Sequence, residues 1–454
     1  MEIKDLCLLS EDEKVIAGEM SARSIPRLGP NWYDGKQVDE VIYARQLLDK
    51  VPMVCINDTL YTPIGELINE SHLKHCIAED VSYYLATELS KKVEQIIKSV
   101  KLIAYKDEPP ISCDRIALNN GTYYLGQGFS EEMEFSLNRI PVCYKKDAAK
   151  PSHWLNFISE LLYEEDINAF QEYMGYCLIP TNKAQKMLLI LGNGGEGKSR
   201  IGLTLQAMLK DALTQGSLCD LERDRFAKAN LLNKLVFFDD DMALEALPDT
   251  HKLKSIVTLE GKTDIEFKGK QSFQAPIYSR IVAVGNGTLS SLHDRSNGFY
   301  RRQLILVAKP VNPDRVNDPY LIDKLKNELE GILQWFIEGL ERLIKNDYQF
   351  TISERAEDNL KTAMEEGNNI ISFLNSEGYI YFEKNTKATS MQLTQVYHHY
   401  CDDNCLKPMS DKTFLNHLKS NSDKYGLTYT NNLDGGGGKK VRGFIGVHTQ
   451  IRAD

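Results

Sequence analysis

Several features that would assign a chain of 454 residues to a specialised class are missing from this sequence. Its nine cysteines contain no CxxC pair, which fits reduced thiols in a reducing compartment. No apolar run approaches the roughly 18–20 residues of a membrane span, so no membrane partner is expected. The first residues, MEIKDLCLLSEDEK, lack the basic start and apolar stretch of a signal peptide. These absences predict a cytoplasmic protein.

An excess of basic residues is missing as well. The chain has 54 Lys and Arg against 64 Asp and Glu, a net charge of -10, which argues against a generic nucleic-acid coat. A motor that lines one channel with basic side chains is not excluded, because binding follows the local field rather than the total charge. With 42% hydrophobic and 26% charged residues the chain is globular, and its length predicts two to four domains.

The most specific motif lies in the run LLILGNGGEGKSR, residues 188–200. An apolar run leads into G-x-x-x-x-G-K-S, the phosphate-binding loop, and a helical pattern follows. Its glycines let backbone amides approach phosphate oxygens, Lys198 would reach the β- and γ-phosphates, and Ser199 would bind Mg²⁺. The nucleotide site is expected to comprise Gly192, Asn193, Gly194, Gly195, Glu196, Gly197, Lys198 and Ser199.

A second apolar run, LVFFDDD, ends in three carboxylates, an arrangement typical of a Walker B strand. Asp239 is expected to hold Mg²⁺ together with Ser199, and Asp240 to orient the attacking water as general base. Asp241 is a rival, so the register is open by one residue. The guanine-reading pattern Asn-Lys-x-Asp fails at Asn182, where the sequence is NKAQ, so the nucleotide is expected to be ATP.

Two further strands are predicted in YSRIVAVGNG (278–287) and YRRQLILVAKP (300–310). Asn286 ends the first of them, where its amide could sense the γ-phosphate or position water. Arg301 and Arg302 precede the second, and an arginine supplied across a subunit boundary would stabilise charge in the transition state; Arg302 is slightly favoured. Strands with functional groups at their carboxyl ends predict an open α/β sheet with its site at that edge.

Two segments have patterns suited to DNA. GKTDIEFKGKQSFQAP (261–276) predicts a hairpin with Lys268 and Lys270 at its tip, where they could contact phosphates. Near the C-terminus, a short amphipathic helix that begins at Ser410 is followed by a hairpin with a Gly-rich, basic tip, which suggests a winged helix. Its expected DNA contacts are Lys412, Lys419, Lys439, Lys440 and Arg442. Zinc at the YHHYCDDNC segment is not expected, because no second ligand pair has finger spacing.

The order of these motifs resembles that of the superfamily 3 (AAA+) helicases, in the branch of phage and plasmid primase C-terminal helicases and poxvirus-type primase-helicases. The resemblance runs over roughly residues 55–450, through LILGNGGEGKS, NKLVFFDDD, LKSIVTLEGKTDIEFKGK, RIVAVGN and DRSNGFYRR. It implies an AAA+ P-loop core that assembles as a hexamer, with ATP between subunits and Arg301 or Arg302 as the finger. It also implies 3′→5′ movement on single-stranded or forked DNA, in a bacterial host cell.

Four regions are expected. They are an N-terminal region of unclear role (1–60), an α+β domain (61–152), helices plus the ATPase core (153–347) and the winged-helix domain (348–454). The first region shows no zinc site or carboxylate cluster, so a separate primase or other replication protein could be a partner.

We therefore expect an ATP-dependent DNA helicase for replication of a phage, plasmid or mobile genomic island. The main competing hypothesis is an initiator ATPase that assembles on an origin without processive unwinding. A DNA-packaging ATPase would need a nuclease domain, and no such domain is visible in the sequence.

Overall fold

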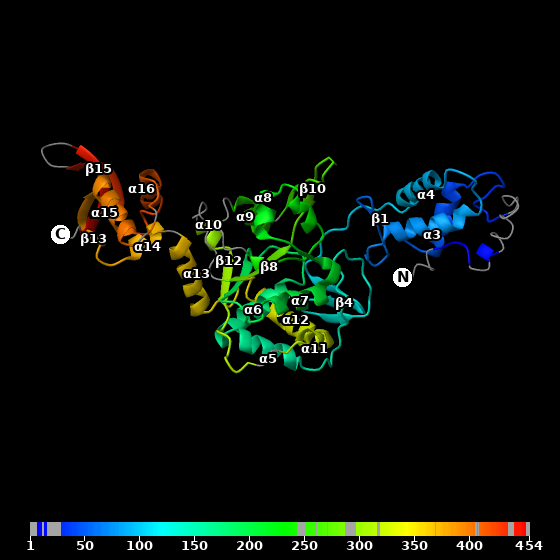
Figure 1. The fold of residues 1–454 in the computed structure, drawn as a ribbon, viewed down its shortest axis with the longest axis horizontal. Helices are drawn as coiled ribbons and strands as arrows, with labels where there is room; N and C mark the ends of the chain where they lie inside the picture. The colour runs from blue at the N-terminus through cyan, green and yellow to red at the C-terminus, as the bar shows by residue number, and fades with distance from the viewer. Residues whose placement is uncertain are drawn as a thin grey trace.

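The computed structural model describes residues 7–10, 13–15, 29–242, 250–258, 261–269, 271–286, 297–315, 318–367, 369–404, 406, 408–434 and 440–450. They form three units in a row: an N-terminal unit, a large central unit and a C-terminal unit (Figure 1). None of the helices in these ranges is long and apolar enough to cross a membrane.

The N-terminal unit is a small helical body with its own hydrophobic core. Its buried side chains run from Cys7 to Ala104 and form a cluster separate from the rest of the molecule. In α4, for example, Val93, Ile96, Ile97 and Val100 recur at helical spacing on the buried face. The elements are α2 (Glu40–Lys50), β1 (Val54–Ile56), β2 (Thr59–Tyr61), α3 (Glu70–Ser82) and α4 (Leu89–Ile103).

Hydrophobic packing divides the chain at other points than the sequence suggested. The boundary expected at residue 60 falls within β2, whose Leu60 belongs to the N-terminal core, and the next cluster begins only at Ile116. Likewise, Ala356 and Ala363 pack into the central clusters, so the C-terminal unit begins near Ile370 rather than at residue 348.

A five-stranded parallel sheet forms the centre of the molecule. Its strand order is β12-β6-β11-β8-β7, so the sheet's first strand in sequence, β6, lies between its last two, β11 and β12. This agrees with the predicted open α/β sheet. The strands are β6 (Met187–Gly192), β7 (Leu213–Gln215), β8 (Val236–Met242), β11 (Arg280–Asn286) and β12 (Gln303–Val307).

Both faces of this sheet are buried, which explains why its strands read as continuous apolar runs. Along β6, Leu188 and Ile190 face one hydrophobic cluster, whereas Leu189 and Leu191 face the other. Side chains in a strand alternate between faces, so this division is the expected one. The helix after β6 lies very close to the sheet: a Cβ at Gly202 would come within 2.1 Å of the Phe238 ring.

Helices cover the two faces unequally. The larger cluster holds α5, α6, α7, α12 and the small antiparallel sheet β3-β4-β5, and the smaller one holds α8, α9 and the β9–β10 hairpin. In Figure 1 the first group lies below the sheet and the second above it. The remaining bounds are β3 (Arg115–Leu118), β4 (Gly121–Tyr124), β5 (Gly128–Ser130), α5 (Ser152–Leu161), α6 (Glu164–Tyr176), α7 (Ser199–Leu209), η2 (Lys210–Ala212), α8 (Leu218–Arg223), η3 (Ala227–Leu231), α9 (His251–Thr258), β9 (Lys262–Ile265), β10 (Phe273–Pro276), α10 (Asn297–Tyr300), α11 (Leu321–Asn327), α12 (Leu329–Lys345) and α13 (Glu354–Gly367).

Two elements differ in detail from what their sequence patterns predict. The segment 118–129, whose pattern predicts one hairpin with a polar turn, contains both turns of a three-stranded meander. The helical pattern at 319–347 is broken at Glu328, whose carboxylate accepts the backbone amides of His153 and Trp154 at 3.1 Å each. A carboxylate at the start of α5 satisfies amides that have no partner within that helix.

The amino end of β11 is held by the segment that precedes β6. The guanidinium of Arg280 is buried and donates to the Thr181 carbonyl at 2.6 Å, above the ring of Tyr176. Tyr173 Oη donates to the Ile281 carbonyl at 2.8 Å, and the Asn182 amide donates to the Ile277 carbonyl at 2.9 Å. These contacts fix where β11 starts relative to β6.

The C-terminal unit packs three helices on a three-stranded antiparallel sheet of order β13-β15-β14. Ser410 caps the helix expected there, because its hydroxyl accepts the Thr413 amide. A pair of closely stacked rings, Tyr397 and Phe414, lies in the core, 4.4 Å apart. The elements are α14 (Asn369–Asn375), β13 (Ile380–Thr389), α15 (Ser390–Asp403), α16 (Asp411–Ser420), β14 (Thr428–Asp434) and β15 (Lys440–Thr449).

Candidate functional site

The glycine-rich loop lies between β6 and α7, the context expected for a phosphate-binding loop. Gly194, Gly195 and Gly197 have φ values of 104°, 84° and 96°, which side-chain-bearing residues rarely adopt. The loop therefore depends on glycine at these three positions. It turns its backbone amides inward, toward the side chain of Glu196.

Glu196 occupies the centre of the loop with its own carboxylate. Oε1 accepts the backbone amides of Asn193 and Gly194, Oε2 accepts Gly194 again at 3.0 Å, and Lys198 Nζ lies 2.7 Å from Oε2. The carboxylate is thus a stand-in anion for the phosphate that such a loop is expected to bind. The donor set of the loop therefore fits an anion.

Lys198 and Asn286 meet although 88 residues separate them. Asn286 lies opposite Gly192 in the parallel pairing of β11 with β6, which brings its side chain to the mouth of the loop. Lys198 Nζ donates to Asn286 Oδ1 at 3.3 Å and is itself almost fully buried. The site expected at the carboxyl edge of the sheet is therefore assembled by neighbouring strand ends.

The three acids of β8 do not alternate as a regular strand would require. Asp239 pairs with Ala283 of β11 and Met242 pairs with Gly285, so β8 has one extra residue between these positions. Such a bulge re-aims side chains, and here Asp240 and Asp241 are both exposed toward the cavity.

Asp239 is turned away from that cavity. Its carboxylate is buried and accepts the backbone amides of Leu218 at 2.7 Å and Asp241 at 3.3 Å. Burial raises the pKa of Asp239, and the two amides offset only part of this effect. The expectation that Asp239 faces Mg²⁺ is thus not met by this geometry: Asp240 and Asp241 are the acids that line the cavity with Ser199.

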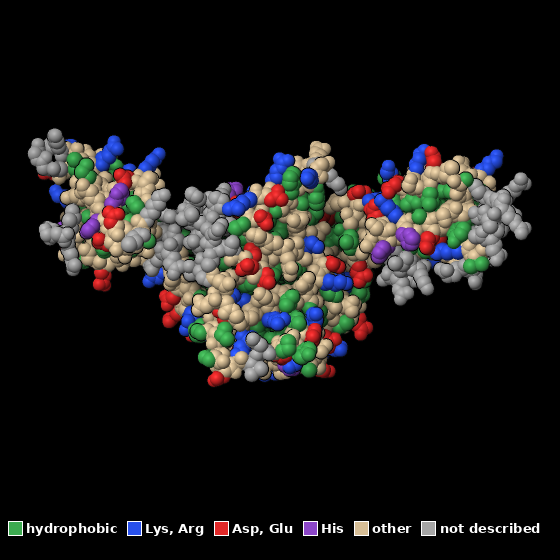
Figure 2. Space-filling view, viewed as in Figure 1, with side chains coloured by type: hydrophobic (Ala, Val, Ile, Leu, Met, Phe, Trp, Pro, Cys, Tyr) green, Lys and Arg blue, Asp and Glu red, His purple; other side chains and the backbone are tan. Residues whose placement is uncertain are grey.

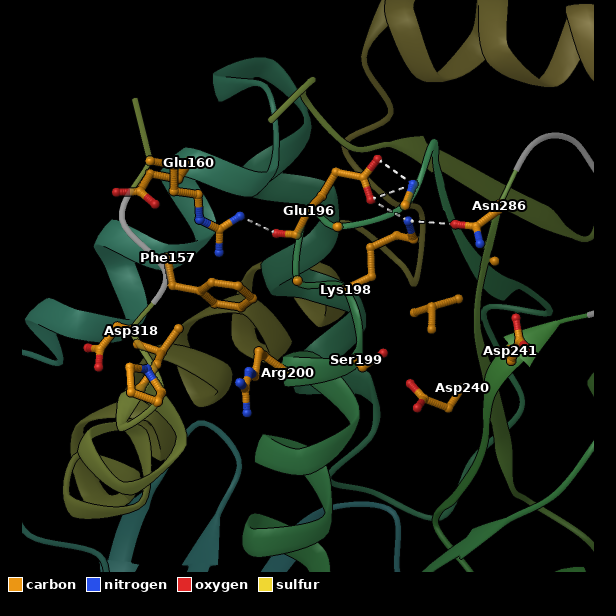
Figure 3. Close-up of a pocket in the computed structure, with 18 of the residues that line it drawn as sticks. Phe157, Glu160, Glu196, Lys198, Ser199, Arg200, Asp240, Asp241, Asn286 and Asp318 are labelled. Atoms are coloured by element: carbon orange, nitrogen blue, oxygen red, sulfur yellow. Dashed lines mark hydrogen bonds and ion pairs between the residues drawn. The ribbon is translucent and has the colours of Figure 1, made fainter. Parts of the chain in front are cut away.

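One cavity of about 990 Å³ is lined by Lys198, Ser199, Asp240, Asp241 and Asn286 (Figure 3). Ser199, Asp240 and Asp241 supply oxygen ligands of the kind that Mg²⁺ prefers. Figure 3 shows Lys198, Ser199, Asp240 and Asn286 facing the same space, with Phe157 and Asp318 on the far wall. The cavity therefore has a polar part at the glycine-rich loop and a second part next to α5.

Sequence reasoning missed the second part of this cavity. Phe157 from α5, Pro319 from the segment before α11 and Leu321 at the start of α11 give it an apolar wall. Arg315 also lines it, and its guanidinium donates to the Glu196 carbonyl at 2.7 Å. Phe157 lies within WLNFISELL, and its helical spacing gave it the appearance of a core residue, whereas Arg315 belongs to no recognisable pattern.

The two arginines expected to act on phosphate lie at the opposite edge of the sheet. They precede β12, whose first residues pair with the start of β6, whereas the cavity lies where β6 ends. Arg301 is exposed, and among the described residues its guanidinium has no hydrogen bond or ion pair. Arg302 is partly buried and donates to the Gly298 carbonyl. Neither lines the cavity of its own chain.

The residues expected to touch DNA lie outside the cavity. Lys268 is exposed at the turn of the β9–β10 hairpin, while Lys270 lies outside the described residues. Lys412 and Lys419 are exposed on α16, and Lys419 Nζ lies 4.0 Å from the centre of the Tyr429 ring. Lys440 and Arg442 are exposed on β15, and Lys439 lies outside the described residues.

Comparison with known proteins gives one sequence match and a set of structural ones. Residues 190–302, which run from β6 to the start of β12, match a family of unknown function, DUF5906. No curated protein matches the chain. Solved structures of the NrS-1 C-terminal region match it with TM-scores of 0.54, 0.53 and 0.51 at 12%, 12% and 11% identity.

The chain shares its fold with the NrS-1 C-terminal region. The first of these matches covers 91% of this chain and all of the NrS-1 fragment, residues 305–718, in its apo form. The likeness therefore extends across all three units rather than the central sheet alone. At this identity it is a likeness of fold, and the function has to be argued from the site.

Proposed function

We propose that the chain is a ring-forming, ATP-dependent DNA helicase that serves replication of a phage, plasmid or mobile genomic island. One observation carries the proposal. A phosphate-loop lysine, a serine, two carboxylates and an asparagine from three adjacent strand ends line a single cavity. The resemblance to superfamily 3 helicases and the fold of the NrS-1 C-terminal region support it.

Each residue of the cavity has a role in this proposal. The amides of Asn193 and Gly194 and the Lys198 ammonium bind the phosphates, while Ser199 and an acid of β8 hold Mg²⁺, which neutralises charge on them. The second acid orients the attacking water. Asn286, already in contact with Lys198, senses the terminal phosphate.

The apolar wall beside the loop suits a nucleoside. Phe157, Pro319 and Leu321 lie on the same side of the cavity as α5, where a base could pack against the aromatic ring. A triphosphate held by the loop would extend its base in this direction. ATP, with Mg²⁺, remains our proposed cofactor, because the guanine-reading motif is missing.

Arg200 and Arg315 line the cavity, but the two arginines proposed as the finger do not reach it in their own chain, and this is the reason to propose a ring. Arg301 and Arg302 lie at the far edge of the sheet from their own cavity. In a closed ring of like-oriented subunits, the edge that carries them can face the cavity of the next subunit. We propose a hexamer, in line with the resemblance to superfamily 3 helicases.

The elements that carry the described candidates for DNA contact lie on one side of the molecule. In Figure 1 the β9–β10 hairpin, α16 and β15 all lie on the upper side, and Figure 2 shows Lys and Arg side chains along that edge of the central and C-terminal units. Local positive charge of this kind binds phosphates although the whole chain is acidic. We propose that Lys268 and Lys270 grip single-stranded DNA and that the C-terminal unit, as a winged helix, engages duplex or forked DNA.

A strand-displacement assay tests this function directly. Forks with a 3′ or a 5′ single-stranded tail are incubated with the chain, Mg²⁺ and ATP, with Lys198→Ala as the inactive control and Lys326→Ala on exposed α11 as the matched control. We expect ATP-dependent unwinding of the 3′-tailed fork by the wild type and by Lys326→Ala only. The absence of unwinding on both forks would exclude the helicase.

A variant of the β9–β10 hairpin distinguishes a helicase from an initiator that uses ATP only to assemble. Lys268→Ala combined with Lys270→Ala should abolish unwinding while ATP hydrolysis and the ring stay intact. Native mass spectrometry and an ATPase assay provide the two controls. Unwinding at the wild-type rate by this double variant would remove the hairpin from the mechanism.

A further inference from the structure

An acidic residue inside a phosphate-binding loop is unexpected, because its charge has the same sign as that of the ligand. Glu196 could point to solvent, as a surface glutamate usually does. Instead its side chain is 4% exposed, and both carboxylate oxygens turn into the loop. The loop has thus folded around its own anion.

We propose that Glu196 is an internal competitor for the phosphate position, and that nucleotide binds by displacing its carboxylate. The proposal rests on the proposed function only in taking ATP as the ligand of this cavity. It gives Glu196 a positioning role that the loop pattern does not require, since the pattern leaves this position open.

The contacts of Glu196 are the first argument. The amides of Asn193 and Gly194 and the ammonium of Lys198 are the groups that such a loop directs at phosphate oxygens. All three donate to the Glu196 carboxylate, the Lys198 ammonium at 2.7 Å. Charge-assisted hydrogen bonds of this kind are the stronger ones in proteins. The empty loop is therefore a satisfied state, and a phosphate cannot use these donors until the carboxylate leaves.

Space gives the second argument. A Cβ added at Gly192 would lie 2.6 Å from Glu196 Oε1 and 2.8 Å from Lys198 Nζ, so the carboxylate and ammonium fill the space directly above the strand end. Figure 3 shows Glu196 above Lys198, with its hydrogen bonds directed at the loop. The carboxylate and a phosphate cannot occupy this space together.

The third argument is that Glu196 can leave without unfolding the loop. Its carbonyl oxygen accepts the Arg315 guanidinium at 2.7 Å, which holds the backbone of residue 196 in place. Rotation about the side-chain bonds alone would therefore carry the carboxylate out. Lys198 would keep its contact with Asn286 during this change.

The carboxyl group is charged when it makes these contacts. Burial raises the pKa of Glu196, but the hydrogen bond from Lys198 and the backbone amides outweigh it, so the pKa lies below its ordinary value of 4.5. Near neutral pH the competitor is an anion, as is the phosphate that replaces it.

This arrangement predicts a lower apparent affinity for nucleotide. When the binding-competent state is only a fraction of the population, the apparent dissociation constant rises by the inverse of that fraction. The same carboxylate can return as products leave, which favours their release. Removing its charge should therefore tighten the binding of ATP and ADP together.

The experiment compares Glu196→Gln with Glu164→Gln. Glu164 is exposed in the first turn of α6 and does not line the cavity, so its change removes one negative charge away from the site. Fluorescent ATP and ADP analogues are titrated into each full-length chain, and thermal unfolding verifies that each is folded. We expect Glu196→Gln to bind both nucleotides about tenfold more tightly, equivalent to about 1.4 kcal/mol, and Glu164→Gln to match the wild type.

Two further measurements keep the outcome clear. Glu196→Ala removes the competitor altogether and should bind at least as tightly as Glu196→Gln, and inorganic pyrophosphate should protect it from unfolding more than the wild type. Unchanged or weaker binding in both Glu196 variants overturns the proposal, and so does a failure of every variant to bind nucleotide. Tighter binding by Glu196→Gln in a chain that does not unwind DNA would support the competitor and refute the helicase.

Discussion

The two edges of the central sheet differ in nearly every property that matters for catalysis. At the carboxyl edge, Lys198 is buried and Asn286 and Asp240 line a deep cavity. At the amino edge, Arg301 is exposed and lies outside that cavity. The carboxyl edge carries the groups proposed to bind phosphate, and the amino edge carries an exposed arginine. The two edges are one strand length apart.

This difference indicates that the proposed ATP hydrolysis would depend on assembly of two or more subunits. A chain that carries its whole site in one place works alone, whereas a chain whose binding and charge-stabilising groups are on opposite edges needs a neighbour. ATP binding would then be a property of one subunit and hydrolysis a property of two. The predictions below separate these properties.

Removing Arg301, the exposed arginine at the amino edge, should have the largest effect on ATP hydrolysis. Arg301→Ala is expected to leave ATP affinity within about twofold and to slow hydrolysis by about 10³-fold, since a finger in trans is worth at least that much. Equilibrium nucleotide binding measures the affinity, and steady-state kinetics measure the rate of hydrolysis. Mixing this variant with Lys198→Ala should restore part of the activity, because some interfaces regain both halves.

Arg302→Ala is the matched comparison for this experiment. The sequence slightly favoured Arg302, but its guanidinium donates to the Gly298 carbonyl and its backbone carbonyl accepts the Met187 amide at 2.7 Å. We expect a lower melting temperature and a smaller loss of rate than with Arg301→Ala. A larger loss of rate with Arg302→Ala, or no rescue in verified mixed rings, would refute the assignment to Arg301.

At the carboxyl edge, substitutions of Asp239 and Asp240 should affect hydrolysis differently, because only Asp240 faces the cavity. Asp240→Asn is expected to reduce hydrolysis about 10²–10³-fold while nucleotide still binds, because it removes a charge that faces the cavity. Asp239→Asn should reduce it far less. Equal losses in these two variants would mean that Asp239 turns into the cavity during the reaction.

The smallest effect concerns stability and pH. Burial raises the pKa of Asp239 above its ordinary value of 3.8, so the folded chain binds this proton more tightly than the unfolded chain does. The free energy of unfolding should therefore fall as the pH rises from about 3.8 through the pKa of Asp239 in the folded chain. The Asp239→Asn variant should not show this decrease. Urea unfolding of both chains across this pH range tests it, and parallel curves would contradict it.

The sequence predicts those parts of the site that depend on local pattern. The strand, loop and helix around Lys198 follow from an apolar run, glycines and helical spacing, and Asn286 was expected to end a neighbouring strand. Parallel strands bring their carboxyl ends together, so the meeting of Lys198 and Asn286 follows from the α/β class. Apolar residues at helical spacing in residues 153–178 likewise predict two helices, and α5 and α6 form there.

The rest depends on events that no local pattern records. The bulge in β8 changes which acid faces the cavity, and it arises from pairing with β11 rather than from the acids themselves. Arg315 reaches the loop because the chain returns past it after β12. Glu196 folds back because the loop offers unpaired donors, a property of the folded backbone. Each of these is a tertiary event at a position that the motifs leave undetermined.

The fixed start of β11 has a consequence for which changes the site can tolerate. Because Arg280 and Ile281 are tied to the segment before β6, the position of Asn286 is set by the number of residues between the tie and the strand end. Deleting one residue there would draw the amide back by about 3.3 Å and turn it to the other face. Strand length is thus part of the site, and apolar substitutions of similar size at Ile281, Val282 and Val284 should be tolerated better than insertions or deletions in β11.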